Sequence, residues 1–208
     1  MFGTQHYSLF LLSCVLLSLT PGQDTLYIIG RSVAQGRRAG LVSVLGICSG
    51  ALVHTFAAAF GLSAILATSA SAFVVIRLAG AAYLVYLGIR MWMDRSTELQ
   101  PSAAVAQASE WSIYRAGFLT NLLNPKVALF YLAFLPQFVD SLVPSKVAAF
   151  LFLGASFLTI GTTWCVCLVF AASAIGSRLR KSSSTGAIMR RATGALFVGL
   201  GIRLAVSK

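Results

Sequence analysis

The chain has 208 residues, of which 58% are hydrophobic and only 10% are charged. Because soluble domains carry about 25% charged residues, this composition excludes a soluble globular domain and predicts a polytopic membrane protein with little mass outside the lipid. The net charge of +11 does not indicate nucleic-acid binding, because the basic residues lie in short loops between apolar segments, where such residues set membrane topology.

Six apolar segments follow one another along the chain, so we expect an all-α protein with six transmembrane helices. Each segment supplies the ~20 residues that one crossing requires. The first segment lacks the basic residues and the cleavage site of a signal peptide, and we interpret it as a retained helix. If it does not span the bilayer, five helices result. In chain order the segments are residues 6–30, 39–67, 73–93, 114–138, 148–175 and 188–206.

A polar stretch at residues 94–112 divides this single transmembrane domain into two halves, 1–93 and 113–208. The third and sixth segments match, because RLAGAAY begins at Arg77, RATGALF begins at Arg191, and each segment ends in Gly-Ile-Arg. Since three helices are an odd number, the second copy must enter the membrane the other way up. The match therefore predicts two inverted three-helix repeats, a common transporter design.

The distribution of basic residues predicts the orientation of these helices. The loops after the first, third and fifth segments hold 11 of the 16 Lys and Arg residues. The positive-inside rule places such loops in the cytoplasm, and both termini then lie outside.

Two charged residues lie inside apolar segments, each next to a helix-breaking proline. Asp24 follows Pro21-Gly22 in the first segment, and Lys126 follows Asn124-Pro125 in the fourth. A charge at bilayer depth costs several kcal/mol and is rarely kept without a role, and a proline in a membrane helix frees backbone groups that need other partners. One broken helix in each half, with opposite charges, predicts a transporter whose binding site lies near the middle of the membrane.

The two breaks offer complementary partners for an amino acid. The half-helix that begins near Gln23 and Asp24 presents free N–H groups, and so does the half-helix that begins near Lys126. We expect Lys126 and these N–H groups to bind a carboxylate, and Asp24 to bind an ammonium. The alternative is an Asp24–Lys126 salt bridge that only ties the halves together, although a bridge that opens on protonation or substrate binding would combine both roles.

Three further polar residues are candidates for the site. Asn121 and Asn124 lie three residues apart on one helix face, and they either bind substrate or satisfy carbonyls freed by the adjacent proline. His54 shares a face with Gly46 and Gly50, which permit close helix packing; it either takes up a proton or stays neutral and hydrogen-bonded. The full candidate set is Pro21, Gly22, Gln23, Asp24, His54, Asn121, Asn124, Pro125 and Lys126.

The remaining residues show no chemistry beyond transport. Trp164, in the fifth segment, is interpreted as a packing or interhelical hydrogen-bonding residue. No catalytic triad, phosphate-binding loop, metal-ligand cluster or dinucleotide fingerprint occurs, so we expect neither an enzyme nor a bound metal or cofactor. Four cysteines lie in apolar segments without Cys-x-x-Cys spacing and are interpreted as small buried packing residues: Cys14, Cys48, Cys165 and Cys167.

Five stretches of the sequence form a specific combination of motifs. They are TPGQDTL (20–26), RSVAQGRRAG (31–40), the third segment from 77 to 90, GFLTNLLNPK (117–126) and FLPQF (134–138). Together they resemble the LysE/RhtB amino-acid exporters over nearly the whole chain. The resemblance implies a multi-pass protein of a bacterial inner membrane that exports amino acids or derivatives, such as threonine, homoserine, leucine or lysine, by proton-driven antiport. Gln23 replaces the second proline of the family's common Pro-Gly-Pro-Asn/Asp pattern, so the resemblance does not identify the substrate.

Two other classes of membrane protein stand as alternatives. A thiol oxidoreductase of related architecture needs a redox cysteine pair, for which Cys165-Val166-Cys167 is a poor candidate. A metal-ion exporter needs several intramembrane carboxylates or histidines, whereas only Asp24 and His54 are available. The partners expected are an amino-acid substrate, the lipid bilayer and protons, with no nucleic acid; glycine-rich helix faces also permit a homodimer.

Overall fold

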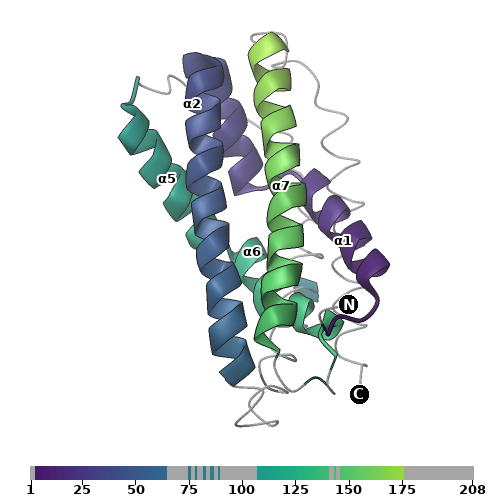
Figure 1. Ribbon diagram of the computed structural model, residues 1–208. Helices are drawn as coiled ribbons and strands as arrows, with labels where there is room; N and C mark the ends of the chain where they lie inside the picture. Colours follow the sequence, from purple (N-terminus) through teal and green to yellow (C-terminus); the bar gives the residue numbers. More distant parts are fainter. Residues whose placement is uncertain are drawn as a thin grey trace.

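A computed structural model describes residues 3–64, 107–140, 143 and 146–175, together with six single positions between 75 and 89. The elements named in this part are all helical (Figure 1). Most of the segment expected at 73–93, the whole segment expected at 188–206, the match between them and most of the 94–112 stretch lie outside the described residues. The elements are α1 (Tyr7–Leu19), α2 (Gln23–Phe56), η1 (Ala57–Leu62), α5 (Glu110–Leu122), α6 (Pro125–Leu129), η2 (Phe130–Phe134), η3 (Leu135–Phe138) and α7 (Val147–Ile175).

The first helix stops where the proline–glycine pair begins. α1 has 13 residues and ends at Leu19, and Thr20 then adopts an extended conformation with φ −73° and ψ 120°. At 1.5 Å per residue α1 is about 20 Å long, shorter than the ~30 Å hydrocarbon core of a bilayer. The helix resumes at Gln23, which is the first residue of α2.

The chain reverses inside α2 at Gly36. This residue has φ 80° and ψ −174°, a left-handed backbone that glycine adopts without strain. Ser32 and Gly40 come into contact across the turn, and Ile28 packs in the same buried cluster as Val44. The loop between the first two apolar segments is therefore a tight turn at one residue, whereas the apolar pattern placed it over residues 31–38.

The fourth apolar segment begins earlier than expected. Ser109 caps α5, and its hydroxyl accepts a hydrogen bond from the Ser112 N–H at 3.3 Å. Glu110 is the first helical residue, where its negative charge complements the helix dipole. The helix therefore starts inside the stretch that was expected to be a polar linker, because Ser109 supplies a helix start in a segment that is polar in composition.

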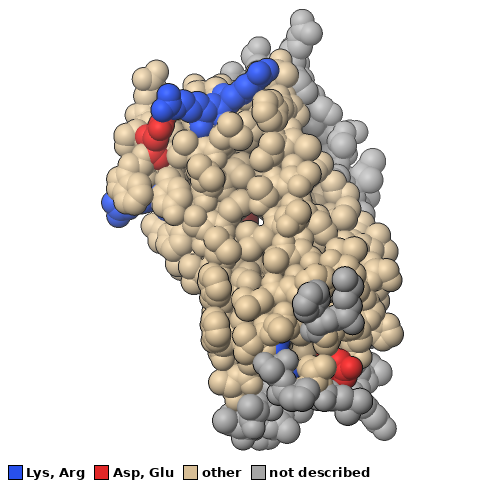
Figure 2. Space-filling model, viewed as in Figure 1, with Lys and Arg blue, Asp and Glu red and all other residues tan. Residues whose placement is uncertain are grey.

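The distribution of apolar and charged residues fits helices embedded in a bilayer. Among the described residues, Val147–Ala174 and Gln23–Leu62, whose longer arm follows the turn at Gly36, are long and apolar enough to cross a membrane. Glu110–Leu122 with Pro125–Phe138, bent by 45°, is a third candidate. Figure 2 shows charged side chains near the two ends of the visible face and an uncharged band between them. In Figure 1 the turn within α2, the start of α5 and the end of α7 lie at one end of the molecule, and the N-terminus lies toward the other end.

Two glycines of α2 set the distance between α2 and α5. A Cβ atom at Gly46 would overlap the backbone oxygen of Tyr114, and one at Gly50 would lie 2.9 Å from the backbone oxygen of Phe118. From the opposite side, a Cβ at Gly117 would lie 2.9 Å from the Ser43 oxygen. The two backbones therefore approach as closely as the Gly-x-x-x-Gly spacing predicts.

We expect Gly46→Ala to lower the stability of the protein by about 1–3 kcal/mol, because the added methyl group forces α2 away from α5. Gly61→Ala is the matched control, since a Cβ there meets no atom within 4 Å, and it should leave the melting temperature unchanged or raise it. Thermal unfolding of the two purified variants in detergent measures the difference. Equal melting temperatures would show that the close packing of α2 and α5 is unimportant.

Candidate functional site

A cavity lies between the end of α1, the two arms of α2, the junction of α5 with α6, and α7. Its volume, measured as the space that the centre of a water molecule can occupy, is about 80 Å³. On the same measure about 10–15 Å³ is enough to hold one water. The cavity is therefore large enough for a small polar solute. Its walls are largely apolar and include Leu17, Ile47, Ala51, Val127, Phe157 and Leu158.

Asp24 provides an acidic group in this cavity. It lies in the first turn of α2 because the helix restarts directly after Pro21-Gly22. One carboxylate oxygen, Oδ2, accepts a hydrogen bond of 2.8 Å from Nδ2 of Asn121. The other oxygen, Oδ1, is buried and has no hydrogen-bond partner, and the same holds for Oδ1 of Asn121. Both residues line the cavity, so the pair presents two buried acceptors to it.

Lys126 connects the second break to the first. Asn124 caps α6 by accepting a hydrogen bond of 3.0 Å from the Lys126 N–H, which fixes the start of that helix. The Lys126 ammonium donates to the backbone oxygens of Leu17 at 2.9 Å and of Thr20 at 3.1 Å. These carbonyls end α1, where a helix dipole favours a cation. An ammonium carries three donors, and the third has no partner among the described residues.

The direct Asp24–Lys126 salt bridge that the sequence offers as an alternative is not formed. Each charge has other partners: Asp24 binds the Asn121 amide, and Lys126 binds the carbonyls at the end of α1. Both residues nevertheless line one cavity and act on each other electrostatically. Opposite charges that share a cavity without cancelling each other are available to a ligand.

Trp164 of α7 completes the polar part of the cavity wall. Its indole Nε1 is buried and has no hydrogen-bond partner. An indole N–H can only donate, so this residue differs in kind from the two unpaired acceptors. Leaving a buried donor unsatisfied costs about 1–3 kcal/mol, which favours the binding of an acceptor at this place.

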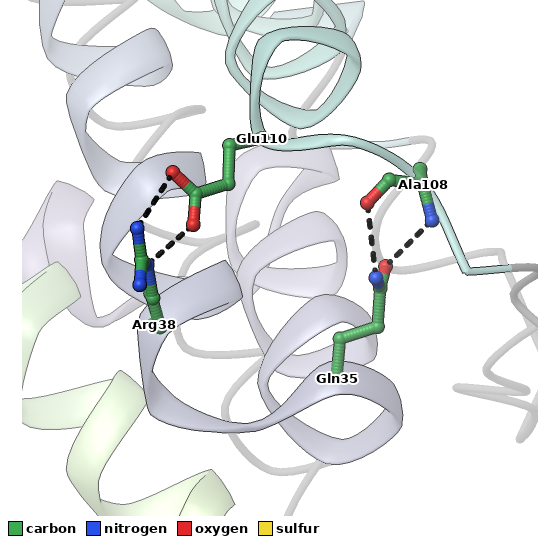
Figure 3. A network of polar contacts seen from close by, with 4 residues as sticks. All are labelled: Gln35, Arg38, Ala108 and Glu110. Atoms are coloured by element: carbon green, nitrogen blue, oxygen red, sulfur yellow. Dashed lines mark hydrogen bonds and ion pairs between the residues drawn. The ribbon is translucent and has the colours of Figure 1, made fainter.

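A polar network at the charged end of the molecule fastens α2 to the start of α5 (Figure 3). The Gln35 amide donates to the Ala108 oxygen at 3.1 Å and accepts from the Ala108 N–H at 3.4 Å. Arg38 and Glu110 form an ion pair. Since their side chains are 84% and 52% exposed, this pair contributes less than about 1 kcal/mol. The network positions α5 rather than stabilising it strongly.

A family model for the LysE type translocator matches residues 15–208. The chain belongs to the LysE type translocator family. This confirms the resemblance that the motifs around the two breaks indicate. No solved structure gives a significant match to the chain.

Relatives of this LysE type translocator align with it over nearly their whole length. An uncharacterised membrane protein of Vibrio cholerae is 34% identical over 202 residues, covering 96% of each chain. The membrane protein YrhP of Bacillus subtilis is 30% identical over 92% of this chain and 94% of its own. A leucine efflux protein of Salmonella typhimurium is 26% identical over 98% of this chain and 96% of its own. The family level therefore supports an amino-acid exporter in a membrane.

The translocator brings together most of the candidates that its sequence suggests. Gln23 and Pro125 are exposed, and Pro21 does not contribute to the cavity wall. His54 also lies outside the wall; its Nε2 is 3.4 Å from the Asn121 backbone oxygen, and its ring stacks on Tyr131 with centroids 5.7 Å apart. The candidates that do line the cavity are Gly22, Asp24, Asn121, Asn124 and Lys126.

Sequence reasoning missed the contribution of α7 to the cavity. Trp164 was expected to pack or to bond another helix, and neither a charge nor a proline marks it. The one signal is a helical stripe with spacings of three and four residues, which comprises Phe157, Gly161, Trp164 and Cys165. Cys167 is exposed, so the expectation that all four cysteines are buried is wrong for this residue.

Proposed function

We propose that this protein is a secondary active exporter of amino acids in a bacterial inner membrane, driven by proton antiport. The observation that carries the proposal is the sharing of one largely apolar cavity by Asp24 and Lys126, which form no ion pair with each other. A free amino acid has the matching pattern, because its ammonium and carboxylate are fixed a short distance apart next to a side chain of variable polarity.

The acceptor side of the cavity suits an ammonium group. Asp24 Oδ1 and Asn121 Oδ1 are both buried and unpaired, and an ammonium offers three donors. Hydrogen bonds between ionised groups are about twice as strong as neutral ones. Asn121 also holds the second carboxylate oxygen at 2.8 Å, which keeps Oδ1 directed to its ligand.

The charge balance and the apolar wall favour one kind of amino acid within the class. One negative and one positive side chain in the cavity match a zwitterion of no net charge. A lysine substrate would bring a second ammonium against residues such as Ile47, Phe157 and Leu158, and burying an unpaired charge is unfavourable. We therefore infer that leucine-like substrates are preferred over lysine, in keeping with the leucine efflux proteins of Salmonella among the relatives.

Asp24 is also the residue that we assign to proton coupling. Among the described acidic residues it is the one that lines the cavity, and intramembrane carboxylates commonly relay protons in transporters. Protonation would neutralise the partner of the substrate ammonium and release the substrate. A proton entering from outside would thereby exchange for an amino acid that leaves.

We retain the six-helix arrangement of two inverted repeats as part of the proposal. The link from Lys126 in the second break to Leu17 and Thr20 at the first supports an interface between the halves at the site. In such transporters, alternating access arises when one repeat moves against the other around a fixed site.

Transport by purified protein in liposomes tests the proposal. Vesicles loaded with radiolabelled leucine, threonine, homoserine or lysine are followed with and without a proton gradient, and an ionophore that collapses the gradient provides the control. We expect proton-dependent movement of leucine at a rate at least about ten-fold above that of lysine, given the charge burial that lysine requires. Transport of none of these amino acids would refute the substrate class, and leucine transport indifferent to the ionophore would refute the coupling.

A further inference from the structure

We propose that the indole N–H of Trp164 is the donor that recognises the carboxylate of the transported amino acid, and that it sets the requirement for that carboxylate. This inference rests on the proposed function, since it assigns a role within the same cavity. It adds a residue on α7 to a site that the two breaks alone would place on α2, α5 and α6.

The buried side-chain atoms without a partner show a pattern. In the part of the chain that the structure describes, such atoms occur on five residues, and three of those residues line the cavity: Asp24, Asn121 and Trp164. The first two present acceptors, whereas Trp164 presents a donor. A ligand that satisfies all three atoms must carry both a donor group and an acceptor group, as an amino acid does.

The other donors near the site are largely engaged. Asn121 gives its amide to the Asp24 carboxylate. Lys126 gives two of its three donors to carbonyls at the end of α1, so one remains for a ligand. A carboxylate has room for several hydrogen bonds, and Trp164 Nε1 supplies a donor that has no competing partner.

Trp164 can also be distinguished experimentally from Trp111. The chain contains three tryptophans, and Trp111 is 66% exposed on α5, where it stacks on Tyr114. Trp111 does not line the cavity. It therefore serves as a matched control for any effect of replacing a tryptophan in this membrane protein.

The test measures equilibrium binding, which does not depend on a complete transport cycle. Isothermal titration of the purified protein in detergent compares leucine with 3-methylbutylamine, the same molecule without its carboxylate. We expect Trp164→Phe to weaken leucine binding by about ten-fold or more, because a hydrogen bond to a charged group is lost. The same change should leave the affinity for the amine unaltered, and Trp111→Phe should alter neither affinity.

A second variant separates the loss of the N–H group from a change in the size of the side chain at this position. Replacing Trp164 with benzothienylalanine keeps the two fused rings and exchanges only the N–H for sulfur, so it should weaken leucine binding as Trp164→Phe does. Undiminished leucine binding by the benzothienylalanine variant would overturn the inference, and so would an equal loss of amine binding. Either result leaves the proposed function standing, whereas a wild-type protein that binds no amino acid would refute that function itself.

Discussion

Asp24→Asn is expected to reduce leucine export at least about ten-fold while leaving the amount of protein in the membrane unchanged. Asparagine keeps an oxygen that accepts the Asn121 amide, now 2.8 Å from Asp24 Oδ2, so the local fold is preserved. It removes the charge that binds the substrate ammonium, and a hydrogen bond to a charged group contributes about 1.5–3 kcal/mol. Initial export rates from loaded liposomes, normalised to reconstituted protein, measure the effect.

Glu110→Gln is the matched control for Asp24→Asn, because it also neutralises a carboxylate by an isosteric change. Glu110 lies at the exposed end of α5, and its ion pair with Arg38 is weak. The control should export at the wild-type rate. If Asp24→Asn also exported at that rate, Asp24 would be excluded as the substrate and proton partner.

Lys126→Met is expected to lower the free energy of unfolding by about 2–5 kcal/mol and to abolish export. The change removes two hydrogen bonds, to the oxygens of Leu17 and Thr20. A hydrogen bond from a charged donor contributes about 1.5–3 kcal/mol. The Leu17 oxygen keeps the bond of 3.3 Å from the Thr20 N–H, whereas the end of α1 loses its cation. Chemical denaturation of the purified variant measures stability, and transport by the folded fraction measures function.

Lys146→Met provides the corresponding control, since Lys146 lies in the connection before α7 and donates to the Val143 oxygen at 3.4 Å. Its stability and transport should both match the wild type. Lys126→Arg is the informative second variant, because it retains the charge and should recover much of the stability. A stable and active Lys126→Met protein would remove Lys126 from both the site and the fold.

The location of the candidate site follows from the sequence to a large extent, because burying a charge in lipid is unfavourable. Asp24 and Lys126 stand out because each is charged, lies in an apolar segment and follows a proline. Their actual partners do not stand out. Lys126 binds backbone carbonyls. Every residue has a backbone carbonyl, so the sequence does not indicate which carbonyls at a helix end accept this bond.

The fold shows the same division between strong and weak signals. Apolar length predicts the long helices, but it overlooks the reversal at Gly36, since one glycine inside a helical pattern is ordinarily tolerated. It also overlooks Ser109, whose cap starts α5 in a polar stretch. Trp164 was missed because a tryptophan in an apolar segment is usual, and only the packing of α7 against the breaks brings it to the cavity.

The hydrogen bonds from Lys126 to the end of α1 affect the order in which the protein is synthesised and inserted into the membrane. Lys126 follows its acceptor Thr20 by 106 residues, and a ribosome needs roughly 5–20 s to add that many. During this interval the end of α1 lacks this cation, although the Leu17 oxygen still accepts the Thr20 N–H at 3.3 Å, and polar backbone at a helix end is unfavourable in lipid. The beginning of α1 can insert early, but its end must stay hydrated until the second half of the chain arrives. Completion of the cavity is therefore a late event in the biogenesis of the protein.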